Sequence, residues 1–279
     1  MDGMPGNTTR EAPPDEPTEA LHDQVLFEIA DGIATITLNR PHRRNALSVF
    51  AAERLRDLWD RIDEDPDVRV AIVTSTDCGV FCAGMDLKDA ARISAEQDRD
   101  ILQLLRDPFY ERMRTVSKPL VAALNGHFTA AGMVLAVNCD LRVGLGGSRA
   151  GIAEVKVGRG SPWAVPMLWM LPQAMVMEMV LSGEMVPAER LHQLGFLNYL
   201  ETDAAAVLHR ATALAGVIRD NAPLSVTAAK RSLMQAASLG CDAGFANAKV
   251  LHVPVYASAD AREGPRAFVE KRVPRWTGR

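Results

Sequence analysis

Two stretches of small residues could present backbone N–H groups to a developing negative charge. In the first, the apolar run 120–124 ends at the turn Asn125-Gly126, and residues 130–132 (Ala-Ala-Gly) then open an expected helix. A helix N-terminus carries N–H groups without intrahelical acceptors, and small side chains let a ligand oxygen approach them. Such a stretch could form half of an oxyanion hole. By itself, a strand, turn and helix joined by small residues is more often a plain structural arrangement.

A second stretch upstream changes that balance. Residues 81–87 (Phe-Cys-Ala-Gly-Met-Asp-Leu) follow an expected apolar strand, residues 68–74, and again place small residues before a helix. Near the front of the chain lie Asn39-Arg40-Pro41 and Asn45-Ala46-Leu47. Together these motifs resemble the crotonase superfamily, the enoyl-CoA hydratase/isomerase family. The resemblance covers about residues 22–276, with the motifs in the family's order and at its spacing.

The resemblance implies an α/β fold, the crotonase (ClpP-like) spiral of β-β-α units with a C-terminal helical region that mediates trimerisation. We therefore expect a core with the active site over residues 21–205 and a helical region over 206–279, assembled as a homotrimer or homohexamer. Residues 1–20 are rich in proline, glycine and acidic residues, and they predict a disordered leader.

The elements that position these motifs are visible in the pattern of apolar residues. Residues 25–29 and 33–38 flank Asp31-Gly32 and predict a β-hairpin. Ser48 is expected to cap a helix that runs to about Asp63. Residues 90–110 are predicted to be a charged, mobile loop over the acyl tail.

Two further features have competing interpretations. Ile101, Leu102, Leu104 and Leu105 could face the substrate, although such a stripe is more often core. Six methionines lie between residues 167 and 185, and they could form core, subunit interface or acyl pocket, with core or interface favoured.

The resemblance also implies the acid–base chemistry. The oxyanion donors would be the backbone N–H groups of Met85 and Ala131, and Glu154 would be the proton-transferring carboxylate. Hydratases of this family use a second glutamate that activates water, and Val134 occupies its place here. Valine cannot accept a proton, so half of a two-carboxylate mechanism is missing. His127 is expected to be a buried histidine with satisfied hydrogen bonds rather than a base.

The remaining site residues are implied to contact the acyl-CoA substrate, whose CoA portion serves as a handle; no other cofactor and no metal are expected. Surface lysines and arginines are usually only solvated. For Arg44, Lys88 and Lys271, a contact with CoA and a plain surface role are therefore equally favoured. The implied contacts are Arg44, Ala46, Ala83, Gly84, Asp86, Leu87, Lys88, Gly132, Val134, Trp163, Phe268 and Lys271.

A single carboxylate suffices for double-bond isomerisation of an enoyl-CoA, because one base can remove a proton and return it elsewhere. This is the favoured activity, with enoyl-CoA hydration as the alternative. A noncatalytic acyl-CoA- or RNA-binding relative is a third hypothesis, and thioester hydrolysis or decarboxylation on the same scaffold a fourth.

Composition limits the partners. Net charge is −4 and no basic block is present, which argues against nucleic acid. No apolar run reaches the roughly 20 residues that cross a bilayer. The four cysteines lack metal-ligand spacing and are typical of reduced thiols in a cytoplasmic protein.

Overall fold

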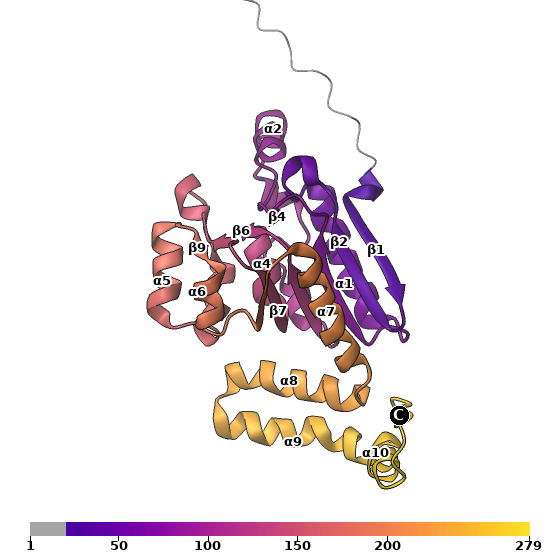
Figure 1. Ribbon diagram of the computed structural model, residues 1–279. Coiled ribbons are helices and arrows are strands. Elements are labelled where there is room, and N and C mark those ends of the chain that lie inside the picture. Colours follow the sequence, from indigo (N-terminus) through magenta and orange to yellow (C-terminus); the bar gives the residue numbers. More distant parts are fainter. Residues whose placement is uncertain (1–20) are drawn as a thin grey trace, which may run out of the picture.

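The computed structural model describes residues 21–279, whose strands form two sheets (Figure 1). The expected leader, residues 1–20, lies outside the described residues. The larger sheet has the order β1-β2-β3-β5-β7-β10 and the smaller one β4-β6-β8-β9. Neighbouring strands are parallel, except in the β1–β2 hairpin and the β8–β9 pair. The strands are β1 Val25–Ala30, β2 Ile33–Leu38, β3 Val70–Ser75, β4 Val80–Cys82, β5 Leu120–Leu124, β6 His127–Thr129, β7 Leu141–Leu145, β8 Arg149–Gly151, β9 Val186–Pro187 and β10 Tyr199–Glu201.

A β-β-α unit repeats along the chain. In the units β3–β4–α2, β5–β6–α4 and β7–β8–α5, the first strand joins the larger sheet and the second joins the smaller one. The predicted α/β spiral is therefore confirmed. The α-helices are α1 Val49–Glu64, α2 Leu87–Gln97, α3 Glu111–Thr115, α4 Ala131–Asn138, α5 Gln173–Ser182, α6 Ala188–Gln193, α7 Ala204–Arg219, α8 Pro223–Leu239, α9 Cys241–Ala257 and α10 Asp260–Val269. The 3₁₀ helices are η1 Leu21–Gln24, η2 Pro41–Arg43, η3 Ile101–Leu104, η4 Glu154–Val157 and η5 Pro162–Trp169.

The larger sheet is buried on both faces, as the continuous apolar run of β3 indicates. Val70 and Ile72 point to one face, where they pack with α7, whereas Ala71 and Val73 belong to the main core on the other face. Three of the six methionines, Met167, Met175 and Met179, lie in that main core. The core interpretation of the methionine stripe is thus correct for these three residues.

Local sequence signals set the ends of several elements. The hairpin forms as predicted, with Ala30 opposite Ile33. The Ser48 side chain accepts a hydrogen bond from the Ala51 N–H and caps α1, which ends one residue beyond the predicted Asp63. Pro223 is the first residue of α8, a position where the missing N–H of proline breaks no helical hydrogen bond.

Two local predictions are wrong. Much of the predicted mobile loop is helical, since Asp86 caps α2 and Ile93 packs its inner face. His127 is exposed rather than buried, because it lies on the short strand β6, where alternation gives the buried position to Phe128. Its Nδ1 accepts a hydrogen bond from the Arg149 N–H at 2.9 Å.

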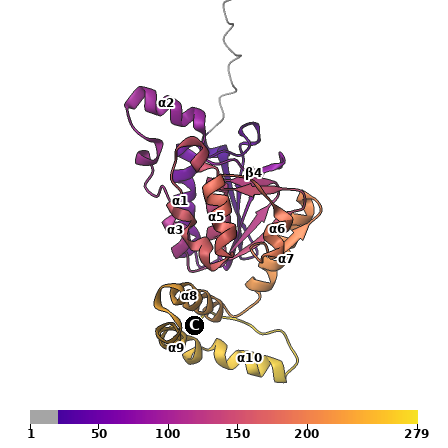
Figure 2. The same cartoon turned by 90° about the vertical axis from the view of Figure 1, so that its left-hand side faces the viewer.

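The C-terminal helices divide between the core and a separate layer. Helix α7 covers one face of the larger sheet through Val207, Ala211 and Ala215. Helices α8 and α9 pack against each other below the sheets, with α10 beside them (Figures 1 and 2). Within residues 21–279, no helix has the length and apolarity to cross a bilayer.

Candidate active site

A pocket of about 270 Å³ lies where the motif-bearing segments of three β-β-α units meet. Met85, Ala131 and Glu154 all line it. They come from the β4–α2 connection, the first residue of α4 and the first residue of η4. The structure thus brings together the three residues for which the sequence predicts roles in chemistry.

The Met85 amide lies in a short parallel bridge between residues 47 and 85. In this bridge the Leu47 N–H donates to Gly84 O, and the Asp86 N–H donates to Leu47 O, each at 2.8 Å. The N–H of Met85 lies between these two bonds and takes no part in the pairing. This arrangement leaves a rigid backbone donor beside the pocket.

The Ala131 amide is the first of α4, so its N–H has no intrahelical acceptor. The preceding Ala130 has φ 49° and ψ −119°, a conformation that L-residues rarely adopt. Backbone strain of this kind costs of the order of 1–3 kcal/mol and persists where packing enforces it. Here it turns the chain sharply from β6 into α4 at the pocket wall.

Close backbone contact holds these two donors together. A Cβ on Gly132 would lie 2.5 Å from Cys82 O, and one on Gly84 would lie 2.8 Å from the Ala130 Cβ. Gly84 also has φ +104°, a conformation that glycine adopts without penalty. The small residues of both motifs are therefore required by the approach of α4 to the end of β4.

Glu154 supplies the carboxylate of the pocket. Its Oε2 is buried and finds no hydrogen-bond partner among the residues that the structure describes. Burial raises the pKa of this carboxyl above its usual value, while its own backbone N–H and the Trp163 side chain act in the opposite direction. A buried, unpartnered carboxylate oxygen is costly for folding, so its retention calls for a functional explanation.

The other predicted contacts divide into two groups. Ala83, Leu87, Val134 and Trp163 line the pocket, whereas Gly84 and Gly132 pack behind it. Arg44 and Ala46 do not line the pocket, but their backbone oxygens bond to its surroundings. Arg44 O accepts from the N–H of the lining residue Ala83, and Ala46 O accepts from the Arg40 side chain. Lys88 is exposed on α2.

Phe268 and Lys271 are not brought to the pocket within this chain. Phe268 is 85% exposed on α10, and Lys271 follows that helix. Helix α10 lies at the far end of the molecule from α2 (Figure 1).

Asp86 orders the loop that follows Met85. Its carboxylate accepts from the backbone N–H groups of Lys88 and Asp89 and forms a buried ion pair with Arg40 at 3.1 Å. This explains how a segment with few apolar residues keeps one conformation next to the pocket.

Several lining residues were not predicted as contacts. Phe109 and Tyr110 come from the connection before α3, and Arg159 from the turn after η4. Ile101 and Leu102 line the pocket too, which favours the substrate-facing interpretation for these two of the four apolar residues. Only a motif within residues 90–110 could have indicated Phe109 and Tyr110, and none is evident there.

Arg159 is held by Asp100 in a two-pronged ion pair. Both guanidinium nitrogens Nη1 and Nη2 donate to the carboxylate, with Nη2 at 2.8 Å from Oδ1. This pairing lowers the pKa of Asp100 and raises that of Arg159.

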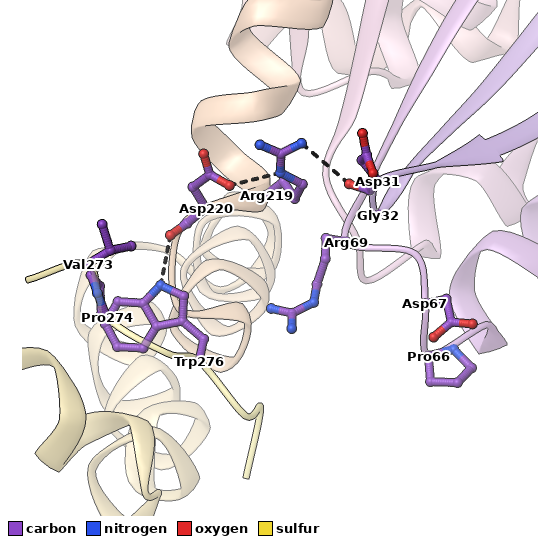
Figure 3. A pocket seen from close by; sticks show the side chains of 10 residues that line it. All are labelled: Asp31, Gly32, Pro66, Asp67, Arg69, Arg219, Asp220, Val273, Pro274 and Trp276. Carbon is purple, nitrogen blue, oxygen red and sulfur yellow. Dashed lines mark hydrogen bonds and ion pairs between the residues drawn. The ribbon is translucent and has the colours of Figure 1, made fainter.

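A larger cavity, of about 510 Å³, lies between the core and the C-terminal segment (Figure 3). It is lined by charged side chains such as Arg69 and Arg219, and the Trp276 indole closes it by donating to Asp220 O at 2.7 Å. None of the predicted site residues lines this cavity. The smaller pocket is therefore the candidate active site, because it combines a buried carboxylate with two backbone donors.

Within residues 21–279, no cluster of three or more histidines, cysteines and carboxylates has the geometry of a metal site.

The fold and pocket define a crotonase-fold enzyme. The crystal structure of an enoyl-CoA hydratase from Mycobacterium tuberculosis H37Rv superposes with a TM-score of 0.82 and is 40% identical, covering 92% of this chain and all of that one. The chain belongs to the enoyl-CoA hydratase/isomerase family, whose model matches residues 28–279. It is therefore an acyl-CoA enzyme.

Two relatives whose names state a substrate match more than 90% of the chain. The (E)-benzylidenesuccinyl-CoA hydratase of Thauera aromatica is 32% identical over 91% of this chain and 99% of its own length. The 2,3-dehydroadipyl-CoA hydratase of Escherichia coli K12 is 31% identical over 92% of this chain and 99% of its own.

Proposed function

We propose that the chain isomerises the double bond of an enoyl-CoA thioester with Glu154 as its single acid–base group. The observation that carries this proposal is the unpartnered carboxylate oxygen of Glu154 in the same pocket as the Met85 and Ala131 amides. Val134, which is buried and lines the same pocket, stands where a second carboxylate would have to be.

The proposed reaction needs one base and two donors. Glu154 removes a proton from C2 of a 3-enoyl thioester, and the electron pair moves through the carbonyl to form a dienolate. The negative thioester oxygen accepts hydrogen bonds from the N–H groups of Met85 and Ala131. The protonated Glu154 then returns the proton to C4, which leaves the double bond between C2 and C3. Loss of one such oxyanion donor typically costs about 3 kcal/mol of transition-state stabilisation.

Binding of the CoA portion is proposed for the cations near the pocket entrance, Arg44 and Lys88. Phe268 and Lys271 are proposed to reach the nucleotide end of CoA bound to a neighbouring subunit, since the pocket of the same chain is distant from them. The chain is proposed to need neither a metal nor a redox cofactor. The four free thiols are consistent with the proposed cytoplasmic location.

Hydration of a 2-enoyl-CoA is the second candidate, because the two relatives described above carry the name hydratase. In that reaction Glu154 alone, or a group not identified, would have to activate water.

The products of one enzyme preparation separate the two activities. We expect purified protein to convert 3-hexenoyl-CoA to 2-hexenoyl-CoA, and to add ¹⁸O-water to crotonyl-CoA only slowly. Val134→Glu should raise the hydration rate relative to wild type, because it supplies the missing carboxylate. Fast water addition by wild type, with slow isomerisation, would reverse the ranking.

A further inference from the structure

Most of the residues that line the pocket are apolar or aromatic. Three rings from two segments line it: Phe109 and Tyr110 from the connection before α3, and Trp163 from η5. Leu102 and Val157 extend the apolar surface between them. Specificity for an acyl group follows from such a lining, since polar or charged groups placed there would lose their hydration.

The size of the pocket suits a ring. An apolar protein cavity of about 150 Å³ holds a benzene molecule. The pocket here has about 270 Å³, which leaves room for the short enoyl unit that must lie between Glu154 and the two amides. A phenyl group joined to a four-carbon enoyl thioester therefore matches both the volume and the lining, and it keeps the C4 that the proposed isomerisation needs.

Charge in the pocket is compensated. Arg159 is the only lysine or arginine among the described residues that line it, and both of its terminal nitrogens bind Asp100. Asp100 is itself fixed, because its Oδ1 also accepts from the Leu102 N–H at 2.9 Å and caps η3. An acyl group that ends in a carboxylate would have to displace Asp100 from this two-pronged pair.

We propose that the acyl group is apolar and ring-bearing, of the 4-phenylbutenoyl type, and that Asp100 excludes carboxylate-ended acyl groups by holding Arg159. This rests on the proposed function, since it assigns the substrate class of the same pocket. Asp100 is a specificity residue that acts through Arg159 and contacts no reacting atom.

Exchange of the C2 proton in deuterated buffer tests both the proposed function and the proposed substrate class. The probes are 4-phenylbutanoyl-CoA, hexanoyl-CoA and the mono-CoA thioester of adipic acid. We expect the phenyl compound to exchange fastest and the adipic thioester slowest, with kcat/KM values at least about tenfold apart. If the adipic thioester exchanges fastest, the substrate class is wrong although the proton-transfer function stands. If none exchanges, the proposed function itself fails.

Asp100→Asn tests the exclusion directly. Asparagine caps helices as well as aspartate does, so η3 should keep its start while Arg159 loses its counter-charge. We expect the ratio of adipic to phenyl kcat/KM to rise about tenfold or more. Glu96→Gln is the matched control, because this exposed acid on α2 pairs with Arg92 and not with Arg159.

The double variant Asp100→Asn/Arg159→Gln gives a second, independent result. The ratio of adipic to phenyl kcat/KM that rises in Asp100→Asn should fall back toward the wild-type ratio in the double variant, because the released guanidinium is then absent. An unchanged ratio in Asp100→Asn, or a raised ratio that persists in the double variant, would overturn the proposal.

Discussion

The environment of Glu154 determines when it can act as a base. Burial raises the pKa of its carboxyl above the usual 4.5, and no lysine or arginine appears among the causes that oppose the shift. As pH falls, a base with a raised pKa is protonated, and so becomes unreactive, at a higher pH than an exposed glutamate would be.

The pH profile of proton exchange should show this. As pH falls, kcat/KM should decline through a midpoint above 4.5, because the carboxylate is converted to the inactive acid. Measurement of C2-proton exchange between pH 4 and 8 locates this decline of kcat/KM. A rate that stays constant down to pH 4.5 would show that Glu154 is not the titrating base.

Glu154→Gln should lower proton transfer by about 10²–10⁴-fold and leave the Kd for CoA thioesters nearly unchanged. Glu64→Gln, at the exposed C-terminal end of α1, is the control and should retain wild-type rates. Normal exchange by Glu154→Gln would remove this residue from the mechanism.

Glu154→Gln should raise the free energy of unfolding at neutral pH, although it lowers activity. A carboxyl with a folded-state pKa above its unfolded value binds more protons when folded, so the stability it contributes falls as pH rises through the two values. At neutral pH the native state therefore carries an unfavourable buried charge that glutamine lacks. We expect a higher Tm for Glu154→Gln than for wild type at pH 7 and a smaller difference at pH 4, by calorimetry.

At the scale of elements, the site depends on how closely α4 approaches β4. Gly132→Ala would place a Cβ 2.5 Å from Cys82 O, which is backbone and cannot move aside easily. We expect a loss of about 1–3 kcal/mol of stability together with a clear loss of exchange activity, because the Ala131 N–H moves with α4. Urea unfolding and exchange rates measure the two effects.

Gly216→Ala in α7 is the matched control for this substitution. Its new Cβ would meet only Arg219 Nη2, at the end of a long side chain and 4.0 Å away, so the change should stabilise the helix by up to about 1 kcal/mol. Equal behaviour of the two variants would mean that close approach at Gly132 does not hold the site together.

Sequence patterns predicted those elements whose ends are fixed by local chemistry. The Asp31-Gly32 turn and the Ser48 cap define their elements regardless of tertiary structure, and the structure confirms both. The short strand β6 was missed, because three residues are too few to show a period and its pairing partners lie in β4 and β8. The error on His127 follows directly from that omission.

The candidate site was predictable only where it follows motifs. Met85, Ala131, Val134 and Glu154 lie in segments that resemble the family's motifs, and all four line one pocket. Phe109 and Arg159 reach the same pocket from irregular segments, where neither spacing nor composition indicates direction. The acyl end of the site therefore had to come from tertiary structure.

At the scale of the whole molecule, the separate helical layer exposes more apolar surface than a lone chain tolerates well. Seven large apolar or aromatic side chains on α8, α9 and α10 are each at least 62% exposed. They are Leu233, Phe245, Val250, Val253, Tyr256, Phe268 and Val269. Symmetric association of identical chains would cover such a surface, and we propose that it brings one chain's α10 to another's pocket.

We therefore expect a homotrimer, or a dimer of trimers, by sedimentation at micromolar concentration. Val250 and Val253 are three residues apart on α9 and so share a face. Replacing both with aspartate should shift the protein toward monomer, because charge would then have to be buried in the interface. The same variant should bind CoA thioesters more weakly, since Phe268 and Lys271 would no longer reach a neighbouring site.

Leu26→Asp, on the distant strand β1, is the control for surface charge and should stay assembled. A wild-type monomer, or an assembled double variant with unchanged affinity, would contradict the role given to this helical layer.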